Sequence, residues 1–177
     1  MRYDLIALNM FIKEMGLPTD VSGSFANRLK LQKALYLIQL TGVDLGYRFS
    51  WYLRGPYSTA LAKDLFELES LLQSEEKEEV SGYQFTAKIK SLLSKSVGLL
   101  QKPAGIDLKD EEWYELLASL HFLKHIAFIP DVKDKSFDVV YKNLTPDKQN
   151  LFGEGIGKKG WDFLEGFKLI KNKKIPS

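Results

Sequence analysis

The sequence predicts a mainly α-helical domain with a small antiparallel β-hairpin in a winged-helix-like core, and about seven helices in all. Apolar residues recur at helical spacing over most of the chain, whereas aromatic and polar residues alternate at 47–53. A second short alternating run at 83–86 can pair with the first. The 177 residues suit one domain. We therefore expect a single unit over 1–177, which could divide into sub-lobes at 1–101 (winged-helix-like) and 106–177 (helical).

The first two helices follow from apolar spacing and from stop signals. Residues 3–15 place apolar side chains three or four positions apart, and Gly16 with Pro18 beyond it ends that helix. Residues 25–41 form the second helix, which is apolar nearly all round in its second half. A helix of that kind is normally central to a domain. We therefore expect residues 25–41 to carry the core.

The aromatic run and the segment after it predict a strand, a turn and a helix. Aromatic or leucine side chains occupy every second position of residues 47–53, which favours a β-strand. Gly55 and Pro56 are expected to end this strand, because proline cannot donate to a sheet ladder and glycine permits the turn. Ser58 then caps a helix that reaches about Gln73.

The second half of the chain predicts further helices. Residues 75–79 form a charged turn, and Thr86 is expected to cap a helix that reaches about Leu100. Residues 102–105, which contain proline and glycine, are the candidate boundary between the sub-lobes. The segments expected beyond it are a helix at 110–128, a helix at 137–143, a turn at 145–147 and a last helix at 161–169.

Composition limits the classes of protein to which the chain can belong. The net charge of +2 is too small to imply a polyanionic partner by itself, and 45% apolar residues argue against a disordered chain. Cysteine is absent, which excludes a disulfide framework, a thiol nucleophile and a thiolate metal site. The N-terminal segment is too polar for a signal peptide, and no apolar run is long enough for a membrane span. We therefore expect a soluble, cytoplasmic protein without membrane contact.

Three motifs follow one another within residues 25–66. Leu-Lys-Leu-Gln-Lys-Ala-Leu-Tyr-Leu at 29–37 precedes Phe-Ser-Trp-Tyr at 49–52 and Gly-Pro-Tyr-Ser at 55–58. This order of a Leu-Gln-Lys helix, an aromatic strand and a Gly-Pro turn resembles that of the Panacea/SocA-like phage-associated antitoxins and their YwgA-like relatives. The resemblance covers residues 25–66 only. It implies a largely helical domain that binds a protein, often in a toxin–antitoxin or phage-defence setting, without enzymatic activity.

The layout is also similar to a winged helix, in which residues 58–72 are the recognition helix and residues 83–86 lie in the wing. A DNA-reading helix presents Arg, Lys, Asn or Gln to phosphates and base edges, but this one carries a single lysine against Asp64, Glu67 and Glu69. We therefore expect a protein partner, with a winged-helix DNA-binding transcriptional regulator as the alternative. The residues available for DNA contact in that alternative are Arg28, Lys30, Lys33, Lys88 and Lys90.

A cluster of arginine and tyrosine around the Gly-Pro turn is the candidate partner-binding site. Its members are Arg48, Tyr52, Arg54 and Tyr57. Tyrosine and arginine are enriched at interface hot spots, because they bury a large area and still form hydrogen bonds at the tip. In the alternative interpretation, the aromatic run is simply core and Arg54 pairs with a nearby carboxylate. The oligomeric state stays open.

Two further motifs are weak signals for a metal or a nucleotide. His121 and His125 are four residues apart, as zinc ligands can be, but they supply at most two ligands. Gly-Ile-Gly-Lys-Lys-Gly at 155–160 matches G-x-G-x-x-G, yet no hydrophobic strand precedes it. We expect structural histidines and a flexible entry to the last helix, and whether residues 153–160 bind a ligand stays open. The sequence therefore predicts a protein that is not an enzyme and needs no metal or cofactor.

Overall fold

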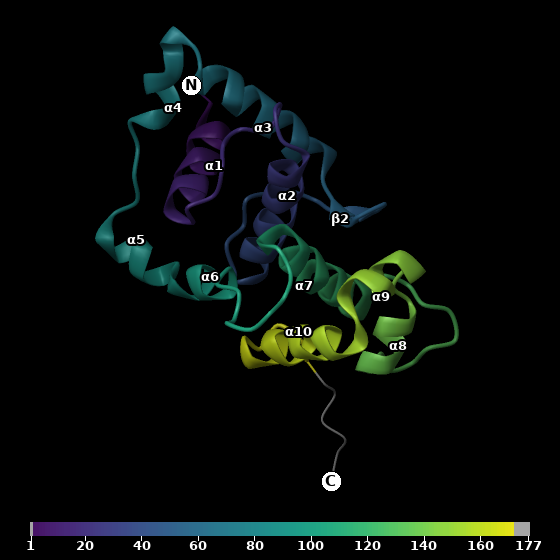
Figure 1. Ribbon diagram of the computed structural model, residues 1–177. Coiled ribbons are helices and arrows are strands. Elements are labelled where there is room, and N and C mark those ends of the chain that lie inside the picture. The colour runs from purple at the N-terminus through teal and green to yellow at the C-terminus, as the bar shows by residue number, and fades with distance from the viewer. Residues whose placement is uncertain (1, 172–177) are drawn as a thin grey trace.

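The computed structural model describes residues 2–171 and is mainly helical over that range (Figure 1). Its helices are α1 (Tyr3–Glu14), α2 (Phe25–Leu40), α3 (Thr59–Leu72), α4 (Glu78–Ser81), α5 (Ala87–Leu92), α6 (Ser94–Leu99), α7 (Asp110–His125), α8 (Phe137–Lys142), α9 (Pro146–Phe152) and α10 (Glu154–Gly166). A 3-10 turn η1 (Glu75–Lys77) and the strands β1 (Ser50–Tyr52) and β2 (Gly55–Tyr57) complete the described part. The predicted class, mainly α with a small antiparallel hairpin, is confirmed, but the described residues form ten α-helices instead of about seven.

Helices α2 and α7 form the centre of the molecule. They pack against each other, and Leu31, Leu35, Leu116 and Leu120 are fully buried between and around them. The hairpin, α3 and α6 also contact α2, while α8 and α10 contact α7 (Figure 1). One hydrophobic cluster therefore contains residues from both sides of the segment 102–105. The expectation that the second helix carries the core is confirmed.

Helices α1, α3 and α4 pack together on the far side of α2 from α10 (Figure 1). The side-chain amide of Asn9 donates to the Val80 carbonyl over 2.8 Å, which fixes α4 on α1. Ser24 and Ser58 cap α2 and α3 as predicted, each accepting a hydrogen bond from a backbone N–H in the first turn. Among the described helices, none combines the length and the apolar character that crossing a bilayer requires.

The hairpin differs from the prediction in its second strand. Strand β1 pairs with β2, in the register Trp51 opposite Pro56, and not with residues 83–86, which form no strand. The turn is Leu53-Arg54, and Gly55 takes a φ of +86°, which favours glycine. A two-residue connection closes at far smaller entropic cost than a loop of about thirty residues. The wing that residues 83–86 were expected to supply is therefore absent, and the winged-helix layout is not confirmed.

The prediction for the Gly-rich segment 155–160 was also wrong. The last helix begins at Glu154, so residues 155–160 lie inside α10 and are not a flexible entry to it. Gly157 and Gly160 are buried against other helices: a Cβ on Gly157 would lie 2.9 Å from the Tyr141 ring, and one on Gly160 would lie 3.1 Å from Leu116. These glycines permit close helix packing, which explains the G-x-x-G spacing without a ligand.

The helix predicted over 86–100 is two helices, α5 and α6, with a bend at Leu93. The bend turns Leu93 and Leu99 into the core, while no residue of α5 is buried. Helix α7 ends at His125 instead of near 128. The bend lies where burial begins, and the end of α7 lies where burial stops, neither of which the apolar spacing alone indicated.

Candidate functional site

Two neighbouring side chains of α2 hold the end of the hairpin in place. The Gln32 side-chain amide donates to the Ser58 carbonyl over 2.9 Å and accepts from the Ser58 N–H over 2.9 Å. The Lys33 ammonium donates to the Pro56 carbonyl over 2.5 Å. Both side chains are buried. The Leu-Gln-Lys and Gly-Pro-Tyr-Ser motifs therefore belong together because the side chains of the first bind the backbone of the second.

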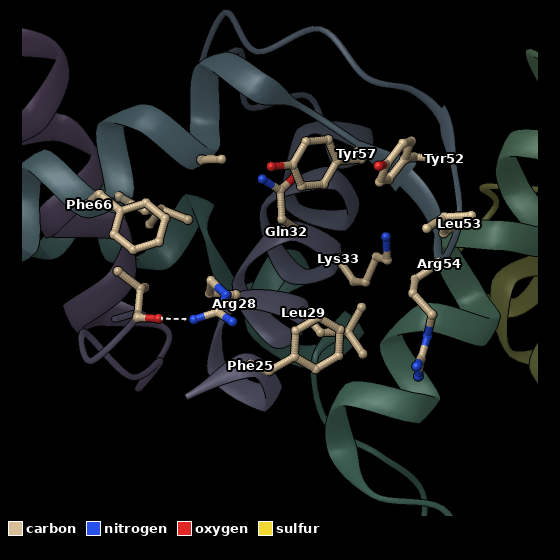
Figure 2. Close-up of a pocket in the computed structure, with 14 residues that line it drawn as sticks. Phe25, Arg28, Leu29, Gln32, Lys33, Tyr52, Leu53, Arg54, Tyr57 and Phe66 are labelled. Atoms are coloured by element: carbon tan, nitrogen blue, oxygen red, sulfur yellow. Dashed lines mark hydrogen bonds between the residues drawn. The ribbon is translucent and has the colours of Figure 1, made fainter. Parts of the chain in front are cut away.

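A hollow of about 300 Å³ opens between α2, the hairpin and the start of α3 (Figure 2). We call it the groove. Its walls are largely apolar. The residues that line it are Val21, Phe25, Arg28, Leu29, Gln32, Lys33, Tyr52, Leu53, Arg54, Gly55, Tyr57, Ala62, Leu65 and Phe66.

Large apolar side chains stand exposed around the groove. Phe25, Tyr52, Leu53 and Phe66 have exposed fractions of 57%, 59%, 77% and 45%. The Tyr52 and Tyr57 rings lie 5.5 Å apart, and Figure 2 shows them together on the hairpin side of the groove. Removing such side chains from water is favourable, and four of them share one rim, as is typical of an interaction site.

Two arginines flank Phe25 at the opposite side of the groove. The guanidinium carbons of Arg28 and Arg54 lie 5.6 Å and 5.9 Å from the centre of the Phe25 ring. Arg28 also donates to the Val21 carbonyl over 2.6 Å. These contacts hold both guanidinium groups beside the apolar walls and give the groove a positive margin.

A cluster of charged side chains, centred on Glu115 of α7, lies between the hairpin turn and α9. Arg54 donates from Nε to both oxygens of Glu115, over 3.0 and 3.2 Å, and the Lys148 ammonium of α9 also bonds to Glu115. Glu115 and Lys148 are almost completely buried. Burial lowers the pKa of Lys148, while the contact with Glu115 opposes that change.

Lys33 lies beside this cluster with its side chain 1% exposed. Burial lowers the pKa of Lys33 to about 7, with Lys148 and Arg54 also lowering it and Glu115 raising it. Lys33 therefore carries its charge in only a fraction of the molecules at neutral pH. A lysine of this kind gains its proton readily when an anion approaches.

The structure brings three of the four predicted partner-binding residues to the groove. Tyr52, Arg54 and Tyr57 line it, whereas Arg48 is exposed and does not. Part of the alternative interpretation also holds. The rings of Phe49 and Trp51 pack on Tyr36 and Phe122.

Arg54 pairs with a carboxylate, as the alternative interpretation also expects, but it reaches Glu115 from the rim of the groove. The same arginine therefore serves both interpretations. The sequence did not single out Phe25, Phe66, Glu115 or Lys148, because each of them comes to the site from a different helix and none belongs to a local motif.

The five residues available for DNA contact do not form one surface. Arg28 and Lys33 line the groove, and Lys33 is buried. Lys30 pairs with Asp110 at 3.1 Å. Lys88 and Lys90 belong to α5, which Figure 1 places apart from α2.

The two histidines belong to α7 and do not line the groove. The Tyr36 hydroxyl and His121 Nδ1 share a buried hydrogen bond of 2.7 Å. Burial, with a smaller contribution from His125, lowers the pKa of His121 to about 3, so the ring is neutral at pH 7. Among the described residues, no three His, Asp or Glu side chains are placed to hold a metal ion.

Comparison with known proteins finds no matching family model, no matching curated protein and no matching solved structure. The resemblance of residues 25–66 to the Panacea/SocA-like antitoxins therefore stays a prediction. The site has to be interpreted from its own geometry.

Proposed function

We propose that this protein is a non-catalytic recognition domain that binds a partner polypeptide in the groove. The single observation that carries the proposal is the rim: Phe25, Tyr52, Leu53 and Phe66 are exposed around one apolar hollow. Aromatic residues and arginine dominate the binding energy of protein interfaces, where they surround or fill pockets of this kind. A partner that inserts an apolar side chain would remove these rings from water.

The charge of the groove specifies the partner further. Arg28, Lys33 and Arg54 line it, and none of its lining residues is acidic. An acidic partner would be attracted to this margin, because complementary charges increase the rate and the specificity of association. The partner that fits best is therefore a polypeptide segment with a large apolar residue and a negative charge close to it.

The titratable groups around the groove have structural partners, which supports binding over catalysis. Glu115 is bound by Arg54 and Lys148, and Lys33 is bound to the Pro56 carbonyl. These bonds fix the hairpin on α2 and α7, so the rim is held in one arrangement. A preorganised surface loses little entropy on binding.

The resemblance of residues 25–66 extends the proposal. If the chain works as the Panacea/SocA-like antitoxins do, its partner is a toxin or a phage-related protein. All the residues that line the groove except Val21 lie within the segment that carries the resemblance, while α7 and α9 support the groove from outside that segment.

The experiment is selection from a random peptide library displayed on phage, with the full chain as bait and tightening washes. We expect enriched peptides to share a large apolar residue with an acidic group beside it. Their affinity is then measured for Tyr52→Ser and for the matched control Tyr3→Ser, since Tyr3 is 73% exposed on α1, outside the groove. Loss of a hot-spot ring should weaken binding by about tenfold or more.

Two outcomes would overturn the proposal. A selection that yields no enriched sequence would contradict the proposal that the protein recognises peptides. Peptides whose affinity falls equally in Tyr3→Ser and Tyr52→Ser, or in neither, would place the binding surface elsewhere.

A further inference from the structure

The charges at the groove do not balance. Arg54 and Lys148 share the Glu115 carboxylate, and Lys33 has as its bonded partner the neutral carbonyl of Pro56. Among the described residues that act on the Lys33 charge, Glu115 is the only carboxylate, against the cations Lys148 and Arg54. Three cations therefore face one anion. A second anion at Lys33 would reduce this excess of positive charge.

The path to Lys33 is apolar. Figure 2 shows the Lys33 amine between the Tyr52 and Tyr57 rings on one side and Leu29 and Phe25 on the other. A free inorganic anion would lose its hydration there without gaining apolar contacts. An anion attached to an apolar group would gain both the charge of Lys33 and the burial of its apolar part.

The size of the groove limits what can enter. A volume of about 300 Å³ lies at the lower end of the range for ligand pockets. It has room for one large side chain with a small polar group beside it. Within a polypeptide, the last residue is the one that carries a side chain and a carboxylate on the same Cα. An internal acidic residue would need the chain to enter the groove and leave it again.

We propose that the groove binds the C-terminal residue of the partner, with its apolar side chain among the rings and its free α-carboxylate on the Lys33 ammonium. This inference rests on the proposed function and specifies the segment of the partner that is recognised. The carboxylate also lies within the field of Arg28 and Arg54 at the margin of the groove. Charge-assisted hydrogen bonds of this kind are about twice as strong as neutral ones.

The pH dependence follows from the groups that face Lys33. These are Glu115 on α7, Lys148 on α9 and Arg54 in the hairpin turn. The pKa of Lys33 in the free protein is about 7. The amine is therefore charged at lower pH and neutral at higher pH, so affinity for a carboxylate should fall as the pH rises from about 6 to about 8.

The test uses N-acetylated hexapeptides titrated into the full chain and followed by amide chemical shifts in NMR spectra. The first probe is Gly-Ser-Gly-Ser-Gly-Phe with a free C-terminus, and the second is the same peptide as its C-terminal amide. The third is Gly-Ser-Glu-Phe-Gly-Ser amide, whose acid is internal. Each is measured on the unaltered chain, on Lys33→Met, and on Lys30→Met, which changes a lysine of the same helix outside the groove.

We expect the free acid to bind about tenfold more tightly than its amide, with shifts at Tyr52 and Tyr57. That preference should persist in Lys30→Met, disappear in Lys33→Met and weaken at higher pH. Because Lys33→Met also loses the bond to Pro56, the comparison of acid with amide on the unaltered chain decides the matter.

Equal binding of acid and amide would overturn the carboxylate inference and leave peptide recognition in place. Binding of the internal-acid peptide at least as tight as that of the free acid would assign the anion to a side chain, which also overturns it. No shift at the groove with any peptide at millimolar concentration would overturn it too, and the library selection would then decide the proposed function separately.

Discussion

Two glycine-containing segments, the hairpin and α10, pack closely against α7 and serve different purposes. A Cβ on Gly55 would lie 2.5 Å from Ser119 Oγ, and one on Gly160 would lie 3.1 Å from Leu116 Cδ2. Around Gly160 the neighbours are buried leucines, whereas Gly55 adjoins exposed rings and cations. Close approach of backbone to helix is thus common to a packing seam and to a candidate site. What distinguishes the site is the uncompensated apolar and positive surface beside it.

The largest effect is expected at Glu115, which joins the hairpin to α9 through Arg54 and Lys148. Glu115→Gln leaves the buried Lys148 ammonium without its counter-charge. Breaking a buried ion pair from one side costs about 3–5 kcal/mol, and most of it should come from Lys148, since Arg54 is exposed in part. Chemical denaturation measures the free energy of unfolding.

The control for that substitution is Glu111→Gln, one turn earlier on the same helix. A half-buried surface position should change the stability by less than about 0.5 kcal/mol. If the two variants lose the same stability, the buried charges around Glu115 do not hold the hairpin to α9.

The next largest effect is expected for Gly55→Ala. The methyl group would collide with Ser119 Oγ, and the φ of +86° is strained for alanine. Left-handed strain and overpacking together should cost about 2–4 kcal/mol. Thermal and urea unfolding measure the loss, and the hairpin should be the region whose amide exchange increases most.

Gly155 provides the matched control, because no atom lies within 4 Å of a Cβ at that position in α10. Gly155→Ala should stabilise the protein by about 0.4–1 kcal/mol, since the unfolded chain loses freedom. Destabilisation in Gly155→Ala comparable to that in Gly55→Ala would show that the contact with Ser119 is not the cause.

A smaller effect is expected at Gly157, where α10 packs against α8 outside the groove. Gly157→Ala would place a methyl group 2.9 Å from the Tyr141 ring, so α8 or α10 must shift. The expected loss is about 1–3 kcal/mol, with no change in peptide affinity at temperatures where the variant is folded. Isothermal titration with a selected peptide checks this. Weaker binding would couple the seam to the groove.

The last prediction concerns the pH dependence of stability due to Lys33. Its pKa is about 7 in the folded protein and about 10.4 when unfolded. The unfolded state therefore binds more protons between these values, and stability rises with pH in that window by up to about 1.4 kcal/mol per unit. Below pH 7 both states are charged and this rise is absent.

Lys33→Met should lack that rise, while Lys30→Met should retain it. The measurement is the free energy of unfolding of the three proteins at several pH values between 7 and 10. Parallel pH curves for Lys33→Met and the unaltered chain would contradict the burial of the charge.

The sequence predicted the elements whose signals are local. The stop at Gly16, the caps at Ser24 and Ser58 and the central position of α2 follow from neighbouring residues alone, and the structure confirms them. The partner of β1 was predicted wrongly. The alternation at 83–86 indicates a strand and Pro56 indicates the end of one, although a two-residue turn closes at a lower entropic cost.

The groove was predictable in part. Tyr52, Arg54 and Tyr57 were identified from composition beside a turn, and they line it. Phe25 and Phe66 were not, since they stand forty-one positions apart and only tertiary packing brings them to one rim. The Glu115–Lys148 pair could not be found either, because charges far apart in sequence give no sign of burial.

The most direct test of the groove as the recognition site is to fill it. Ala62 lines the groove, whereas Ala60, on the same helix, does not and is exposed. Ala62→Trp should weaken the binding of library-selected peptides by at least about tenfold, or about 1.4 kcal/mol, and Ala60→Trp should leave it unchanged. If Ala62→Trp is folded and binds as tightly as the unaltered chain, the groove is not where the partner binds.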